Sequence, residues 1–190
     1  NFNASDNLAR AGTSPVSGSV SVALLESRLH GQSLTGELQA NFADNNLSLS
    51  RLSLQGKGFT LTASGELNQR LALAAQISDF SRLVPGSAGT LQAVGWLRWR
   101  DGGLSGAVTG GGSRLAYAGA RIAAANLSVR LDQGTGYPLH ITASLRDVAY
   151  DGYKLTLSCE ADGTLQSHRV NAVLRSDGSE ARLTLNAGYN

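Results

Sequence analysis

Residues 47–77 read LSLSRLSLQGKGFTLTASGELNQRLALAAQI, and this stretch decides the fold class. An apolar residue stands at nearly every second position, and serine, threonine or glutamine fills most positions between. Successive side chains of a β-strand point to opposite faces of a sheet. The period of two therefore predicts strands with one apolar face and one polar face.

The same alternation continues along most of the chain and predicts an all-β protein. Turn dipeptides such as Asn68-Gln69, Asp101-Gly102 and Asp151-Gly152 separate the apolar runs and indicate a mostly antiparallel meander. The segment 79–84 is the exception: Ser78 or Asp79 can cap a short helical turn that Pro85 and Gly86 end. The predicted strands are 16–25, 29–42, 47–54, 57–67, 70–77, 90–99, 104–109, 115–118, 122–131, 138–145, 153–159, 165–175 and 181–187.

The composition argues against nucleic-acid binding and against a membrane-spanning segment in this chain. The 190 residues are 42% hydrophobic and 16% charged, and the formal net charge is +2. The chain has no basic cluster with interleaved aromatic residues, so we expect no nucleic-acid partner. It begins at Asn1 and contains no methionine, so we expect a fragment of a longer protein. Any membrane anchor would lie outside it, because no run of about 18 apolar residues occurs.

Catalytic and metal-binding motifs are missing from the sequence. His30, His140 and His168 lie far apart without a metal-binding or nucleophile motif beside them, which predicts a protein without cofactor or enzymatic activity. Gly110-Gly111-Gly112 leads from one predicted strand into the next, so we expect a flexible connector there. The single cysteine, Cys159, is expected on the polar face as an inert thiol.

The segment 90–100 carries both tryptophans. Alternation places Trp99 on the apolar face and Trp96 on the polar face, together with Arg98 and Arg100. We expect the turn at 80–84 to fold over Trp96 and cover it. The alternative is that Trp96 and its arginines dock a partner or a membrane headgroup layer.

The run 79–85, DFSRLVP, is followed by Gly89-Thr90-Leu91 and Gly95-Trp96-Leu97. This arrangement resembles a pattern of the TamB family, which is related to AsmA-like proteins, and the resemblance extends over residues 47–190. It is closest to the C-terminal region of these large periplasmic proteins, which are anchored in the inner membrane of Gram-negative bacteria.

The resemblance implies a long sheet curled into a taco-like trough with a hydrophobic interior. Residues 1–14 would be a linker, and residues 15–190 would be a trough domain cut from a longer repetitive β protein. In the family, the trough conducts phospholipid between the inner and outer membranes. The family also works with an outer-membrane barrel partner, TamA, in the assembly of outer-membrane proteins.

The apolar alternation independently provides a surface for acyl chains, because each buried methylene contributes about 0.8 kcal/mol without a specific polar contact. We therefore predict one continuous lipid-binding groove, and we expect the isolated fragment to self-associate through it or through its edges. The groove residues would be Leu47, Leu49, Phe59, Leu61, Leu71, Leu73, Leu127, Val129, Leu131, Leu155, Leu157, Val173, Leu183 and Leu185.

Two other functions remain open at this point. The same fold could be a chaperone-like scaffold whose sheet edges pair with strands of nascent barrel proteins or autotransporters. It could instead be a closed β-sandwich with a structural role, in which a second sheet covers the apolar face. Bound lipid would favour the groove, and edge crosslinks to an unfolded substrate would favour the scaffold. A dry, interdigitated core would favour the sandwich.

Overall fold

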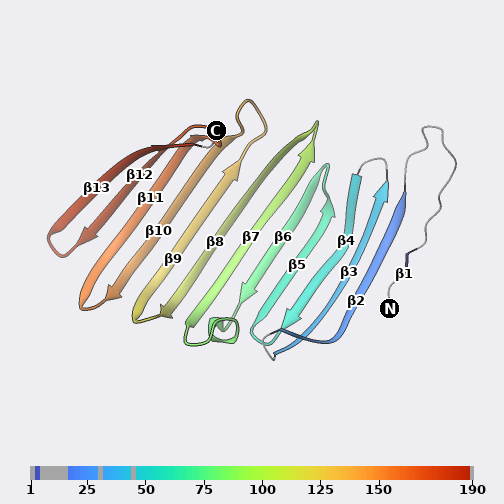
Figure 1. Ribbon diagram of the computed structural model, residues 1–190, viewed down its shortest axis with the longest axis horizontal. Helices are drawn as coiled ribbons and strands as arrows, with labels where there is room; N and C mark the ends of the chain where they lie inside the picture. The colour runs from blue at the N-terminus through green and yellow to red at the C-terminus, as the bar shows by residue number, and fades with distance from the viewer. Residues whose placement is uncertain (1–2, 5–16, 30–31, 44–45, 189–190) are drawn as a thin grey trace.

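The described residues form one open antiparallel sheet of 13 strands, in which each strand pairs with its neighbours in sequence (Figure 1). The computed structural model describes residues 3–4, 17–29, 32–43 and 46–188. The prediction of an all-β curled sheet is confirmed. Most of the predicted linker at residues 1–14 lies outside the described residues, and its described part, Asn3–Ala4, pairs with the next strand.

The strands are long and their connections are short. Their bounds are β1 Asn3–Ala4, β2 Gly18–Leu29, β3 Gln32–Ala43, β4 Asn46–Gly56, β5 Phe59–Glu66, β6 Arg70–Ile77, β7 Ala88–Arg100, β8 Gly103–Tyr117, β9 Ala120–Leu131, β10 Pro138–Tyr150, β11 Tyr153–Thr164, β12 His168–Ser176 and β13 Ser179–Ala187.

One 3-10 turn, η1 at Phe80–Arg82, lies between β6 and β7 and confirms the expected helical turn. Asp79 caps it: its Oδ1 accepts a hydrogen bond from the Ser81 backbone N–H at 3.1 Å, and its Oδ2 accepts one from Arg82 Nε at 3.0 Å. Hydrogen bonds from Ser81 and Arg82 hold the pKa of Asp79 below its ordinary value. The turn lies beside Gly58 in the β4–β5 connection.

The triple-glycine segment is part of a strand, so the expected connector at Gly110-Gly111-Gly112 is wrong. Strand β8 runs without a break from Gly103 to Tyr117 and unites the two short strands predicted there. The glycines serve the packing of strand β7: a Cβ at Gly112 would stand 2.6 Å from Leu91 Cδ2, and one at Gly110 would stand 3.0 Å from Gln92 O. The Leu91 side chain and the Gln92 backbone of β7 thus leave no room for a side chain at these two positions of β8.

Two β-bulges, in β8 and β10, keep the apolar residues on one face where strict alternation would move them to the other, as a bulge at Ser50 and Arg51 does in β4. Arg114 and Leu115 of β8 stand opposite the single residue Gly89 of β7, and two residues of β10 stand opposite one of β11. Arg114 and Asp147 take up the extra residue with positive φ values of 52° and 51°. Leu115 and the other apolar residues beyond the bulges thereby return to the apolar face.

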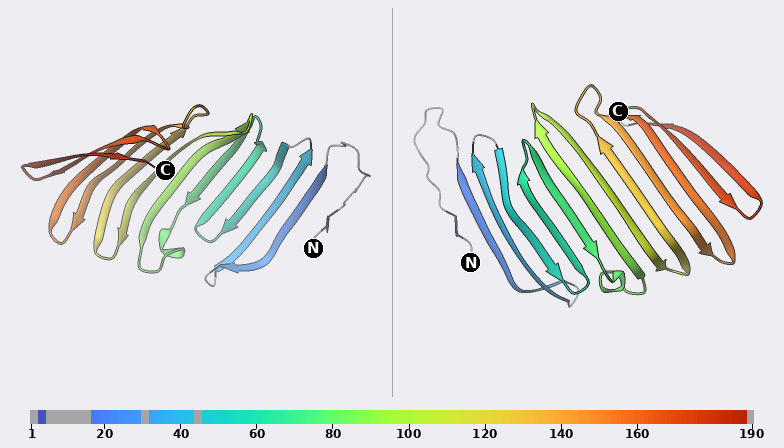
Figure 2. Two further views of the ribbon diagram at one scale, coloured as in Figure 1. Left: turned by 45° about the horizontal axis from the view of Figure 1, so that its top comes forward. Right: turned by 180° about the vertical axis from the view of Figure 1, so that it is seen from behind.

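The most buried part of the sheet lies at β3–β6. Ala40, Leu49, Ala63 and Leu71 form a core cluster against which leucines of the same face pack. Figure 2 shows the strands turning progressively from β2 to β13, so the sheet is twisted and curled. A single layer can bury side chains only by curling on itself, which explains why this core is small.

Candidate functional site

The strand register defines one apolar face, on which residues directly opposite each other lie side by side. All the predicted groove residues except Val173 lie on this apolar face. In β4–β6, for example, Leu54 pairs with Leu61 and Leu61 pairs with Ala75. The register of the other strand pairs places the remaining predicted residues on the same face: Leu47, Leu49, Phe59, Leu71, Leu73, Leu127, Val129, Leu131, Leu155, Leu157, Leu183 and Leu185.

The placement of Val173 was wrong. Val173 pairs with Ser158 on the polar face, whereas its neighbours Ala172 and Leu174 pair with Cys159 and Leu157 on the apolar face. Three apolar residues follow one another at 172–174, so alternation within β12 cannot decide which of them point to the apolar face. The register against β11 decides it.

Cys159 also lies on the face opposite to the one expected. It pairs with Ala143 on one side and with Ala172 on the other, so it belongs to the apolar face. Its position follows from the alternation Leu155, Leu157, Cys159 along β11. The thiol is half-buried and behaves there as one more small apolar side chain.

A row of small residues crosses the apolar face at right angles to the strands. Each member of the row stands directly opposite the next one on the neighbouring strand, from β6 to β12. One large residue, Leu127 on β9, interrupts the row of small side chains. Larger aliphatic residues stand in the rows on either side. The small members are Ala75, Ala93, Gly110, Ala143, Cys159 and Ala172.

The row widens into an apolar hollow of about 430 Å³ over β6–β10. Its lining includes Ile77, Leu91, Ala125 and Leu145, which the sequence analysis did not assign to the groove. The sequence does indicate that these four residues belong to the apolar face, because each of them continues the apolar–polar alternation of its strand. Only the pairing of neighbouring strands shows that they surround one hollow.

The apolar face is more exposed toward the C-terminal half of the sheet. Leu49 and Leu71 are buried, whereas Leu127 on β9 is 47% exposed and Leu183 on β13 is 54% exposed. The described residues form one sheet, so no second sheet covers these side chains within the described part of the chain. The fold is therefore not a closed sandwich.

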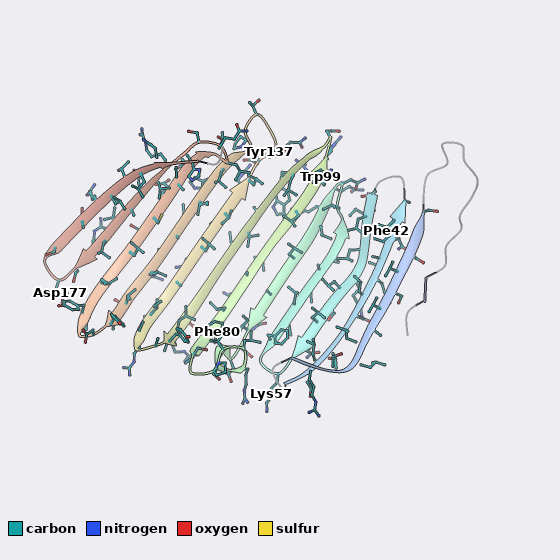
Figure 3. The ribbon with its side chains drawn as sticks, in the orientation of Figure 1. Phe42, Lys57, Phe80, Trp99, Tyr137 and Asp177 are labelled. Atoms are coloured by element: carbon teal, nitrogen blue, oxygen red, sulfur yellow. The ribbon has the colours of Figure 1, made fainter. Side chains whose placement is uncertain are left out.

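The polar face carries hydroxyl and amide side chains and one aromatic cluster. The guanidinium carbon of Arg70 lies 5.4 Å from the centre of the Trp96 ring, and that of Arg98 lies 6.0 Å from it. Arg98 Nε also donates to Ser105 Oγ at 3.3 Å. Figure 3 places Phe80 of η1 and Trp99 at opposite long edges of the sheet. Trp96 pairs with Ala72 near the start of β6, whereas the turn follows the end of β6. The expected cover of Trp96 by the turn is thus wrong, and two arginine guanidinium groups lie near the ring instead.

The sheet also brings together acidic side chains and a histidine that are far apart in sequence. His140 on β10 hydrogen bonds Asp162 on β11, and ligand atoms of both residues and of Glu160 lie within 4.8 Å of one another. The hydrogen bond with Asp162 raises the pKa of His140. No local sequence motif indicates this group, because cross-strand register creates it. These side chains are largely exposed.

Within the described residues, no helix is long and apolar enough to cross a membrane. Comparisons with curated proteins and with solved structures gave no significant match. A family model described as "TamB, N-terminal domain" matches residues 11–190. The family is the one expected from the sequence, but the region differs, because the resemblance had pointed to the C-terminal part. The chain belongs to the TamB family.

Proposed function

We propose that the apolar face of this chain conducts phospholipid between the inner and outer membranes of a Gram-negative envelope. Membership in the TamB family indicates a role in lipid transport or outer-membrane assembly, and such proteins are transport or assembly components rather than enzymes. The observation that carries the finer proposal is the unbroken apolar face. Its ladder rows extend from β2 to β13, and no second sheet within the described residues covers them.

The energetics favour acyl chains as the ligand. Each methylene that leaves water for the apolar face contributes about 0.8 kcal/mol, and a hollow of about 430 Å³ offers room for several of them. No Asp, Glu, Lys or Arg side chain stands in the ladder rows of this face from β3 to β13. An unpaired charge there would oppose the entry of an acyl chain.

The repetition of the rows provides a route for movement. Neighbouring strands, about 4.8 Å apart, carry similar aliphatic side chains on this face. A lipid that shifts by one strand therefore exchanges one apolar surface for a comparable one. Sites of nearly equal free energy allow passage along the sheet, because no single site retains the ligand.

A charge substitution tests this proposal. Leu157 lies on the apolar face of β11, and the adjacent Thr156 lies on the polar face. We expect Leu157→Asp to reduce the phospholipid bound after incubation with vesicles by at least about tenfold, the effect of a 1.4 kcal/mol penalty. Thr156→Asp, the matched control, should bind normally. Mass spectrometry of extracted lipid measures the result, and circular dichroism verifies that both variants fold. Equal binding by two folded variants would contradict the proposal.

The cellular setting is proposed from the family. In this view the parent protein is anchored in the inner membrane, spans the periplasm, and delivers lipid near an outer-membrane barrel resembling TamA. In isolation, the exposed apolar face and the outer strands are expected to promote self-association.

A second candidate function is a scaffold for strands of outer-membrane proteins. The observation that favours it is strand β13, the outermost strand of the sheet, which pairs only with β12 among the described residues and is exposed along its whole length. The unpaired N–H and C=O groups of such an edge can accept another strand. Crosslinks from β13 to an unfolded barrel protein would support this candidate, and crosslinks from the apolar face to lipid would support the first.

A further inference from the structure

Three side chains of the kinds that bind metal ions meet on the polar face of β10 and β11. His140 of β10 stands directly opposite Asp162 of β11, and Glu160 lies two residues before Asp162, on the same face. Ligand atoms of all three side chains lie within 4.8 Å of one another. Two ligands of one zinc ion, each about 2.1 Å from it, lie at most about 4.2 Å apart. Small side-chain rotations therefore suffice to bring all three onto one ion.

The two carboxylates of this group have no arginine partner. Elsewhere on the polar face, Glu180 of β13 accepts hydrogen bonds from both Arg175 and Arg182. Asp162 hydrogen bonds the histidine instead, and Glu160 forms no ion pair within the described part of the chain. Carboxylates that converge without a permanent cation repel each other, and a bound metal ion removes this repulsion.

The set of donor atoms indicates the class of metal. Ca²⁺ and Mg²⁺ bind oxygen ligands almost exclusively, whereas Zn²⁺ binds imidazole nitrogen together with carboxylate oxygen. A hydrogen bond joins His140 Nδ1 to Asp162 Oδ1. A metal ion can replace the proton of this bond, because it binds the same lone pairs. Three protein ligands leave at least one position of a four-coordinate zinc ion for water or another ligand.

The group also borders a polar hollow, which independently favours a bound ligand. The hollow has a volume of about 600 Å³, extends over β8–β12 and includes Glu160 in its lining. Thr142 stands opposite Glu160 on one side and Asn171 on the other, and both also line the hollow. Hydroxyl and amide groups beside metal ligands commonly hydrogen bond a ligating carboxylate or a metal-bound water.

Two arginines near the group limit how strongly a cation can bind. Arg130 of β9 stands opposite His140, but its Nε donates to Asp132 Oδ2 at 2.9 Å. Arg169 of β12 stands opposite Asp162 and makes no ion pair among the described residues. Its positive charge, one strand away, opposes the binding of a cation. Removal of this charge should therefore strengthen metal binding, whereas it would weaken the binding of an anion.

We propose that His140, Glu160 and Asp162 bind a divalent metal ion of the zinc class. The ligands come from two neighbouring strands, so the bound ion joins β10 to β11 and opposes their separation. An ion that binds only the folded chain raises its stability as the ion concentration increases. The site lies on the polar face, opposite to the surface proposed for phospholipid, and it does not depend on the proposed function.

The test measures zinc binding to the chain without an affinity tag. Protein that has been treated with a chelator and dialysed is titrated with ZnCl₂, and separately with MgCl₂, in an isothermal titration calorimeter. The site variant combines His140→Gln and Glu160→Gln. The control variant combines His168→Gln and Glu180→Gln, which remove a histidine and a carboxylate outside the site. Arg169→Gln tests the sign of the charge effect, and circular dichroism verifies that all variants fold.

We expect the native chain to bind Zn²⁺ more tightly than Mg²⁺, and the site variant to bind Zn²⁺ at least about tenfold more weakly. The control variant should bind as the native chain does. Arg169→Gln should bind about threefold more tightly, the effect of removing a unit charge one strand away in water. Zinc should also raise the melting temperature of the native chain and not that of the site variant. Equal zinc affinities of the native chain and the folded site variant would overturn the proposal, and so would weaker binding by Arg169→Gln.

Discussion

Gly95, in the middle of β7, shows how closely neighbouring strands approach at the apolar face. A Cβ at this position would stand 2.5 Å from the Ala107 carbonyl oxygen and 3.1 Å from Val108 Cα. Both are backbone atoms, so a new methyl group cannot be accommodated by a side-chain rotation. We expect Gly95→Ala to lower the free energy of unfolding by about 1–3 kcal/mol, measured by urea denaturation. Gly18→Ala, where no atom lies within 4 Å, should change it little.

His140 and Asp162 give the stability a defined pH dependence. The hydrogen bond with Asp162 raises the pKa of His140, so the folded state holds the proton more tightly than the unfolded state. The His140–Asp162 pair therefore contributes fully to the free energy of unfolding below the unfolded-state pKa of histidine, roughly 6.5. This contribution is lost as the pH rises through the pKa of His140 in the folded state. We expect the difference in unfolding free energy between the native chain and Asp162→Asn to shrink from about pH 5.5 to about pH 8.5. A difference that grows with pH would contradict this assignment.

At the scale of single residues, the sequence predicts the face of a side chain wherever the alternation is unbroken. Leu155 and Leu157 were placed correctly for this reason. Val173 was misplaced because apolar residues occupy three successive positions. The His140–Asp162 pair could not be predicted, since its members lie 22 residues apart and only strand register joins them.

The hairpin turns differ in how well their residues suit the backbone. The turns at Asp101-Gly102 and Asp151-Gly152 place an aspartate at positive φ, which aspartate and asparagine tolerate. Ala118, at φ 48°, holds the same position before Gly119. We expect Ala118→Asn to raise the free energy of unfolding by about 0.5–1 kcal/mol in urea denaturation. Asp151→Asn serves as the control and should be nearly neutral. A loss of stability in Ala118→Asn would show that this turn has a different geometry.

Most strands could be predicted from the sequence, and the errors have common causes. Glycines usually interrupt strands, so 110–112 was expected to connect two short strands. In β8, Gly110 and Gly112 instead allow the backbone of Gln92 and the side chain of Leu91 to lie close to the strand. After residue 112 and after residue 145, a bulge shifts the alternation of apolar and polar residues by one position. The bulge residue in β8 is Arg114, and arginine gives no sign in the sequence that its φ will be positive. Element ends were therefore less predictable than element type.

At the scale of the whole molecule, the described residues form a single layer with two faces of different chemistry. The difference between the two faces was evident from the sequence. Thirteen strands at about 4.8 Å extend the apolar face over roughly 60 Å. The sequence could not show whether a second sheet covers that face, because alternation is the same in an open sheet and in a sandwich. The strand order answers this question, since each described strand follows its neighbour in one sheet.

The claim that the apolar face carries acyl chains is tested most directly by crosslinking in cells. A photoreactive side chain is placed at Leu127, Leu157 or Leu183 on the apolar face, and at Ser128, Ser158 or Thr184 on the polar face of the same strands. After irradiation, mass spectrometry identifies attached lipid. Our account predicts phospholipid adducts at the three leucine positions and none at their polar neighbours. Equal labelling of both faces, or no lipid at any leucine position, would contradict it.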